Sequence, residues 1–72
     1  MKWYIFKTHG EAASCCKLAD LESKSFCRTN NFEAASAIIT GIYGRRGFED
    51  LELLAYDSEK NVATYSSFAV NL

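Results

Sequence analysis

The chain has 72 residues and a formal net charge of −1, with 49% hydrophobic and 14% aromatic residues. This composition is too apolar for a disordered chain, and the charge is too small to steer the whole protein to nucleic acid or to an anionic membrane. The length predicts one domain over residues 1–72 with a small core. At this size, partner binding or self-association into a homodimer commonly adds stability.

The apolar segments are too short for a secretory signal or a membrane span. The run Trp3–Phe6 ends at Lys7, whereas a signal peptide needs about 7–15 apolar residues and a span about 20. Cys15, Cys16 and Cys27 are odd in number and two are adjacent, which is unlike an extracellular disulfide framework. We therefore expect a cytoplasmic protein with reduced thiols in ordinary packing roles.

The first half of the chain predicts two strands separated by a stripe of small residues. Trp3–Lys7 is aromatic and β-branched, which favours a strand inside the sheet. The helical spacing within Glu11–Leu21 favours a short helix, and an irregular or strand-like path is the alternative. Alternation over Lys24–Thr29 predicts the next strand. The stripe consists of Ala12, Cys15, Cys16 and Ala19, widened by Leu18 and Leu21.

The clearest predicted element is a helix over Phe32–Tyr43. Asn31 precedes it as an N-cap, and Gly44 suits the left-handed position just after a helix. One face of the helix is apolar and should pack on the sheet. This face consists of Phe32, Ala35, Ile38, Ile39 and Ile42.

A hairpin completes the predicted fold. Phe48–Tyr56 and Val62–Phe68 alternate as strands around a loop in which Asn61 tolerates a positive φ. The order of elements predicts an α+β fold, an antiparallel sheet of about four strands with one main helix on one face and a second short helix at Glu11–Leu21. The face of the sheet opposite the main helix is an exposed apolar patch unless the Glu11–Leu21 segment covers it. Its side chains are Tyr4, Phe6, Phe26, Leu54, Tyr56 and Phe68.

No pattern points to catalysis, a metal or a cofactor. His9 with Cys15 or Cys16 could form a thiol–imidazole pair, but nothing positions a third group. His9 and three cysteines are enough ligands for zinc, although adjacent cysteines fit a zinc knuckle poorly. The acidic residues Glu49, Asp50 and Glu52 are interpreted as a solvated strand edge. We expect a protein that is not an enzyme, with no catalytic residue, metal site or cofactor.

The candidate binding residues are Tyr43, Arg45, Arg46 and Phe48, a basic and aromatic cluster after the main helix. Arginines here complement the helix dipole, which is a purely structural role. The functional alternative is a contact to phosphate or to a carboxylate of a partner. Two cations of the preceding predicted strand could extend the cluster; these are Lys24 and Arg28.

From Lys24 to Tyr65 the chain combines a strand ending in a polar turn, the helix start Phe32-Glu33-Ala34-Ala35-Ser36-Ala37-Ile38-Ile39, and a hairpin in which Leu54-Ala55-Tyr56 precedes a charged turn. In this it resembles small phage-encoded anti-CRISPR proteins, closest to those that inhibit type I surveillance complexes. The resemblance implies an inhibitor that blocks a host CRISPR-Cas complex by protein–protein contact.

The helix departs from that family, whose helices carry Lys and Arg. Here the predicted exposed face holds Glu33, Ser36, Ala37 and Thr40, so no helix residue is carried over as a binding residue. The order of elements also looks similar to that of small antitoxins. The DNA-binding tail that those antitoxins usually carry is missing here. We expect a non-enzymatic binding protein of a host protein complex. A small nucleic-acid-binding module or an antitoxin-like domain is the alternative.

Overall fold

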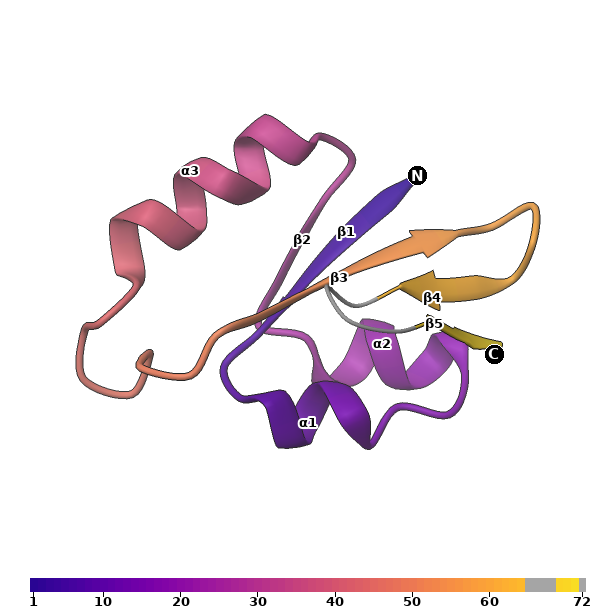
Figure 1. The fold of residues 1–72 in the computed structure, drawn as a ribbon, viewed down its shortest axis with the longest axis horizontal. Helices are drawn as coiled ribbons and strands as arrows, with labels where there is room; N and C mark the ends of the chain where they lie inside the picture. Colours follow the sequence, from indigo (N-terminus) through magenta and orange to yellow (C-terminus); the bar gives the residue numbers. More distant parts are fainter. Residues whose placement is uncertain (65–68, 72) are drawn as a thin grey trace.

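A computed structural model describes residues 1–64 in full and the backbone of residues 69–71. The chain forms an antiparallel sheet with α1 and α2 on one face and α3 on the other (Figure 1). The elements are β1 (Lys2–Phe6), α1 (His9–Ala13), α2 (Leu18–Lys24), β2 (Cys27–Thr29), α3 (Phe32–Ile42), β3 (Glu52–Asp57), β4 (Val62–Thr64) and β5 (Ala69–Asn71).

Within the described residues, five strands pair in the order β2-β1-β3-β4-β5. The predicted α+β class is confirmed, and the short strand β5 is added at one edge. β1 lies between β2 and β3, as predicted for a strand inside the sheet: Tyr4 is aligned with Arg28 on one side and with Leu54 on the other.

This register divides the side chains between the two faces. Tyr4 and Leu54 share a buried cluster with Leu21 of α2. Their neighbours Ile5 and Leu53 are also aligned with each other, and strand alternation places them on the opposite face, where α3 lies. Because strand side chains alternate, the two apolar layers of the protein come from consecutive residues of the same strands.

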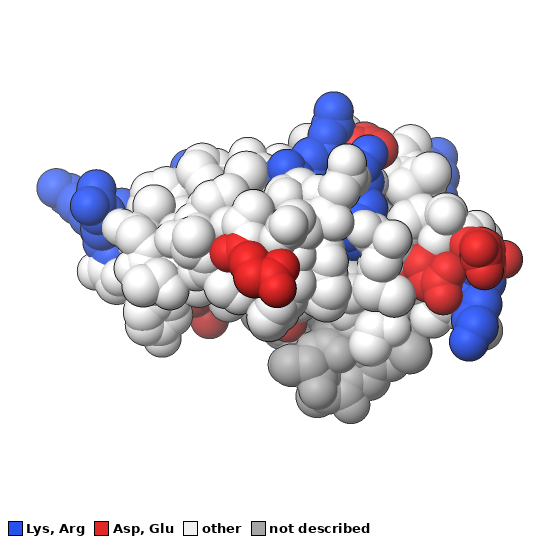
Figure 2. Space-filling model, turned by 90° about the horizontal axis from the view of Figure 1, so that it is seen from above, with Lys and Arg blue, Asp and Glu red and all other residues white. Residues whose placement is uncertain are grey.

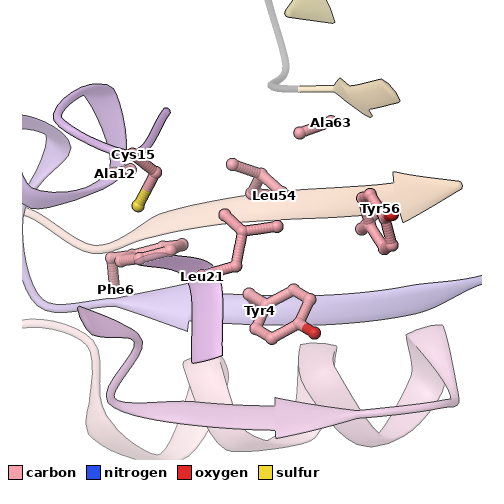
Figure 3. Packing of buried hydrophobic residues seen from close by; sticks show 8 residues of the cluster. All are labelled: Tyr4, Phe6, Ala12, Cys15, Leu21, Leu54, Tyr56 and Ala63. Carbon is pink, nitrogen blue, oxygen red and sulfur yellow. The ribbon is translucent and has the colours of Figure 1, made fainter. Parts of the chain in front are cut away.

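The main core lies between the sheet and the pair α1 and α2. Tyr4, Phe6, Leu21 and Leu54 are fully buried there, and Figure 3 shows Leu21 of α2 reaching in among the strand side chains. Of the two outcomes expected for this face, covered by Glu11–Leu21 or exposed, the structure shows the first, and most of these side chains form the core. The cluster consists of Tyr4, Phe6, Ala12, Cys15, Leu21, Leu54, Tyr56 and Ala63. Phe26 lies outside the strands, and Phe68 lies outside the described residues.

The stripe at Glu11–Leu21 forms two short helices instead of one. Ser14 ends α1, and its hydroxyl donates to the Glu11 carbonyl oxygen. The chain is extended at Lys17, where α2 begins, and the Asp20 carboxylate accepts a hydrogen bond of 2.8 Å from the Cys16 amide. A break here lets two short helices turn over the sheet, so the small residues at Cys16 and Ala19 are exposed.

α3 begins and ends where the sequence predicts, within one residue. The Asn31 side chain caps the helix by accepting from the Ala34 amide at 3.1 Å, and Gly44 has a φ of +86° beyond the last turn. The predicted apolar face is only partly buried. Ala35 is fully buried, but Ile38, Ile39 and Ile42 are half-buried and Phe32 is exposed. This follows from the position of α3, which packs on β1 and β2.

Two predicted strands, Lys24–Thr29 and Phe48–Tyr56, are too long. Lys24 is the last residue of α2, so β2 keeps only the end of the predicted strand. Phe48 to Leu51 belong to the connection before β3, where Phe48 is held by contacts distant in sequence. β4 is described over Val62–Thr64, and the rest of the predicted strand Val62–Phe68 lies outside the described residues. The loop between β3 and β4 agrees with the prediction, with Asn61 at a φ of +53°.

Candidate binding surface

The loop that follows α3 closes on itself through its main chain. The Gly44 amide donates to the Phe48 carbonyl oxygen at 3.0 Å, and the Phe48 amide donates to the Arg45 carbonyl oxygen at 2.8 Å. Gly44 and Gly47 have φ values of +86° and +89°, a region that favours glycine. The sequence therefore builds a tight turn that carries both arginines at its tip.

We call Tyr43–Phe48 the arginine loop. The Tyr43 side chain is 64% exposed, and both arginines are exposed. Among the described residues, neither Arg45 nor Arg46 forms an ion pair. Figure 2 shows Lys and Arg side chains at the end of the molecule where this loop lies in Figure 1. The arrangement presents two guanidinium groups with their donors available to a partner.

The acidic residues after the loop do not neutralise these arginines by direct contact. The Glu49 carboxylate turns back and accepts a hydrogen bond of 3.0 Å from the Gly47 amide. The Glu52 carboxylate lies 3.1 Å from His9 Nδ1. These carboxylates thus fix the loop and its exit. The expected solvated strand edge is wrong, because residues 49–51 precede β3 and Glu52 lies in β3 between β1 and β4.

Phe48 connects the loop to the sheet. Its ring meets Phe26 in a T-shaped contact, with 5.1 Å between ring centroids. The Lys7 ammonium lies over both rings, 5.8 Å from the Phe26 centroid and 5.2 Å from the Phe48 centroid. Phe26 itself is fixed by its amide, which donates to the Ile5 carbonyl oxygen at 2.8 Å.

Lys7 is a site residue that sequence reasoning missed, and the sequence predicts Phe26 on the apolar sheet face and not beside Phe48. Lys7 is 19 positions from Phe26 and 41 from Phe48, by subtraction of their numbers. No local pattern links residues so far apart. Only the placement of β1 between β2 and β3 brings the three segments to one end of the sheet.

The predicted extension of this cluster by Lys24 and Arg28 is wrong. Arg28 pairs with Glu22 of α2, on the face of the sheet opposite α3. The Lys24 ammonium donates to the Ser14 hydroxyl at 3.1 Å, between the two short helices. Both cations therefore belong to the α1 and α2 layer. Lys24 is the last residue of α2, and Arg28 is aligned with Tyr4 on the face of the sheet that α2 covers.

A cavity of about 440 Å³ opens at the other end of the sheet. Its floor includes Tyr4, whose hydroxyl donates to Glu22 Oε1 at 3.1 Å. Burial of the phenol and this hydrogen bond raise the pKa of Tyr4 to about 12. Glu22 also contacts Lys2 at 3.8 Å and Arg28, so both of its oxygens are engaged. The carboxylate serves the fold here and leaves little capacity for a ligand.

The structure does not assemble the cysteine sites considered above. His9 faces Glu52, while the Cys15 thiol is buried and donates to the Glu11 carbonyl oxygen at 3.5 Å. Burial is the main cause that raises the pKa of Cys15, which disfavours the reactive thiolate. Within residues 1–64 and 69–71, no group of three or more His, Cys, Asp or Glu side chains could hold a metal ion.

In the part of the chain that the structure describes, no helix has the length and apolar character needed to cross a membrane. No protein-family model matches the chain, and neither a curated protein nor a solved structure shows significant similarity to it.

Proposed function

We propose that this is a non-enzymatic binding protein that inhibits a bacterial protein complex by occupying one of its surfaces. The observation that carries the proposal is the arginine loop, a tight turn that presents Tyr43, Arg45 and Arg46 to solvent without internal ion pairs among the described residues. Tyrosine and arginine are enriched among the residues that contribute most to protein interfaces. A turn closed by its own main chain loses little conformational entropy on binding.

The neighbouring surface favours a protein partner. α3 carries a single charged residue, Glu33, and Figure 2 shows a largely uncharged face beside the cationic end of the molecule. Phe32 is 50% exposed near the start of α3, and Tyr43 is exposed at its end. A mainly uncharged face with aromatic side chains at both ends suits a protein interface better than a phosphate backbone.

The resemblance to anti-CRISPR proteins supplies a defined candidate partner, a type I surveillance complex. The protein would prevent such a complex from binding target DNA by covering part of its surface. Adding the purified protein to a type I complex and measuring target DNA binding tests this narrower proposal. Unchanged DNA binding by type I complexes would remove this partner and leave the broader proposal to the experiment below.

The broader test compares binding by matched variants. Wild-type protein and the Arg45→Ala, Arg46→Ala and Lys60→Ala variants are used as baits in bacterial lysate, and captured proteins are identified by mass spectrometry. Lys60 is an exposed cation in the β3–β4 loop and serves as the control. A desolvated arginine paired across an interface should contribute about 2–5 kcal/mol, so each arginine variant should lose the partner while the control keeps it. Equal capture by all four baits would contradict the proposal.

Nucleic acid is the second candidate, because the same loop offers two arginines beside aromatic rings. Affinity for DNA or RNA would fall steeply with salt, as counterions are released from phosphates. A protein interface with a mainly uncharged face should show a shallow dependence. Binding of the captured partner measured between low and physiological salt therefore separates these two classes.

A further inference from the structure

We propose that Lys7 and Phe26 extend the arginine loop into one continuous surface, and that this surface takes an acidic segment of a protein partner. The inference rests on the proposed function and names the chemistry that the loop would recognise. The surface consists of Lys7, Phe26, Tyr43, Arg45, Arg46 and Phe48. It combines residues from the end of β1, the turn before β2 and the connection between α3 and β3.

Contacts on both sides of Phe48 make these segments one unit. Lys7 lies over the rings of Phe26 and Phe48, and the two rings pack edge to face. The main chain of Phe48 in turn exchanges hydrogen bonds with Gly44 and Arg45. A displacement of Lys7 or Phe26 is therefore transmitted to the turn that carries the arginines, so Lys7 also acts as a positioning residue for the loop.

The charges of this surface are not balanced within the described residues. Lys7, Arg45 and Arg46 form no ion pair there, in contrast to Lys2 and Arg28, which both pair with Glu22. Glu49, the nearest acidic residue in sequence after the loop, is turned onto the Gly47 amide. Three cations at one end of a chain with a net charge of −1 favour a local acidic partner.

The aromatic rings argue for carboxylates over nucleobases. A base binds an exposed aromatic side chain by stacking on its face. Here Lys7 lies over one face of each phenylalanine ring, and the edge-to-face contact between the rings occupies more of their surface. The two phenylalanine rings are thus partly covered inside the surface, with Phe26 46% exposed, while both arginine side chains remain open. This pattern fits carboxylate side chains, which need donors and no stacking platform.

The test uses two probes of equal length, a hexaglutamate peptide and a hexathymidylate oligonucleotide. Each is titrated into the isotope-labelled full chain, and amide shifts are followed by NMR at low salt. We expect hexaglutamate to shift the amides of residues 7, 26 and 44–48 and to bind more tightly than the oligonucleotide. Wild type is compared with Lys7→Met, with Arg45→Ala/Arg46→Ala, and with Lys60→Met as the matched control for removing one exposed lysine charge.

Removing one exposed cation should weaken the peptide about two- to fivefold, as expected for an exposed ion pair. Lys7→Met should show this loss and should also shift the ring protons of Phe48 and the Gly44 amide in the absence of any probe. Lys60→Met should do neither. Lys7 is exposed, so its replacement should leave the rest of the spectrum unchanged.

Three results would overturn the inference. Tighter binding of the oligonucleotide at the same amides would assign the surface to nucleic acid. Peptide binding that depends on the arginines and not on Lys7 would limit the surface to the loop and leave the proposed function intact. Hexaglutamate shifts that fall elsewhere would reject the acidic partner, and the arginine variants in the lysate experiment would still decide the proposed function.

Discussion

The phenol of Tyr4 donates a hydrogen bond of 3.1 Å to Glu22 Oε1, and this contact joins β1 to α2. Tyr4 is completely buried, whereas Glu22 reaches the surface between Lys2 and Arg28. A single polar contact therefore links the apolar core to a small charged group at the edge of the α1 and α2 layer.

This contact predicts an alkaline limit on stability. The pKa of Tyr4 is raised from 10.0 to about 12, first by burial and then by the hydrogen bond to Glu22. Because the folded state holds the proton more tightly, the stabilisation is complete below about pH 10 and is lost as the pH rises through 12. At most about 3 kcal/mol is involved. Urea unfolding of wild type and Tyr4→Phe should give curves whose difference shrinks above pH 10. Parallel pH profiles would contradict this assignment.

The two layers of the protein should differ in their sensitivity to truncation. Leu21 is fully buried among the core side chains, so Leu21→Ala should lower the free energy of unfolding by about 2–5 kcal/mol. Ile39 on α3 is half-buried, and Ile39→Ala should cost distinctly less. Leu18→Ala, at a 40% exposed position of α2, is the control for Leu21. If Ile39→Ala proves as damaging as Leu21→Ala in denaturant unfolding, the α3 layer holds more of the core than its burial indicates.

Two glycines of the same region should respond in opposite directions to alanine. Gly44 has a φ of +86°, and a Cβ there meets nothing within 4 Å, so Gly44→Ala should cost about 1–2 kcal/mol through backbone strain alone. Gly41 is inside α3 and is equally open, so Gly41→Ala should stabilise by up to about 1 kcal/mol. In a domain of this size, 1 kcal/mol shifts Tm by roughly 4–8 °C. A stabilised Gly44→Ala variant would show that the turn adopts another conformation in solution.

The cysteines should react in the order of their exposure. Cys16 is exposed and Cys15 is buried with a raised pKa, so an aromatic disulfide reagent should modify Cys16 first and reach Cys15 only when the protein unfolds. Mass spectrometry of partly modified protein measures this order. Replacement of all three cysteines by alanine should leave partner binding unchanged in a folded protein. Modification of Cys15 as fast as Cys16 would place α1 outside the stable core.

The parts of the fold that depend on neighbouring residues are predictable from the sequence. The Asn31 cap, the left-handed Gly44 and the positive φ of Asn61 each follow from one side chain, or its absence, and the adjacent backbone. The break between α1 and α2 is not predictable in this way. Helical spacing continues through Cys16, and the chain turns there because the Asp20 carboxylate and the Lys24 ammonium both bind the segment between the two helices.

The candidate site likewise has one part that the sequence predicts and one part that it does not. The arginine loop stands out because its residues are contiguous and lie between a helix end and a strand. Lys7 and Phe26 read as ordinary strand residues, and their contacts with Phe48 exist only because the strand order brings three distant segments together. The early start predicted for β3 fails for the same reason, since Phe48 packs against Phe26 and Lys7 instead of joining the strand.

The position of β1 has a consequence for the growing polypeptide on the ribosome. β1 is synthesised before the other strands of this sheet, yet one of its two neighbours is β3, which begins at Glu52. Until then the nascent chain can pair β1 with β2, but the other edge of β1 has no partner strand. The side chains of Tyr4 and Phe6 also lack Leu54 beside them. Stalled or truncated chains that end before β3 should therefore expose an unpaired edge of β1, which favours aggregation.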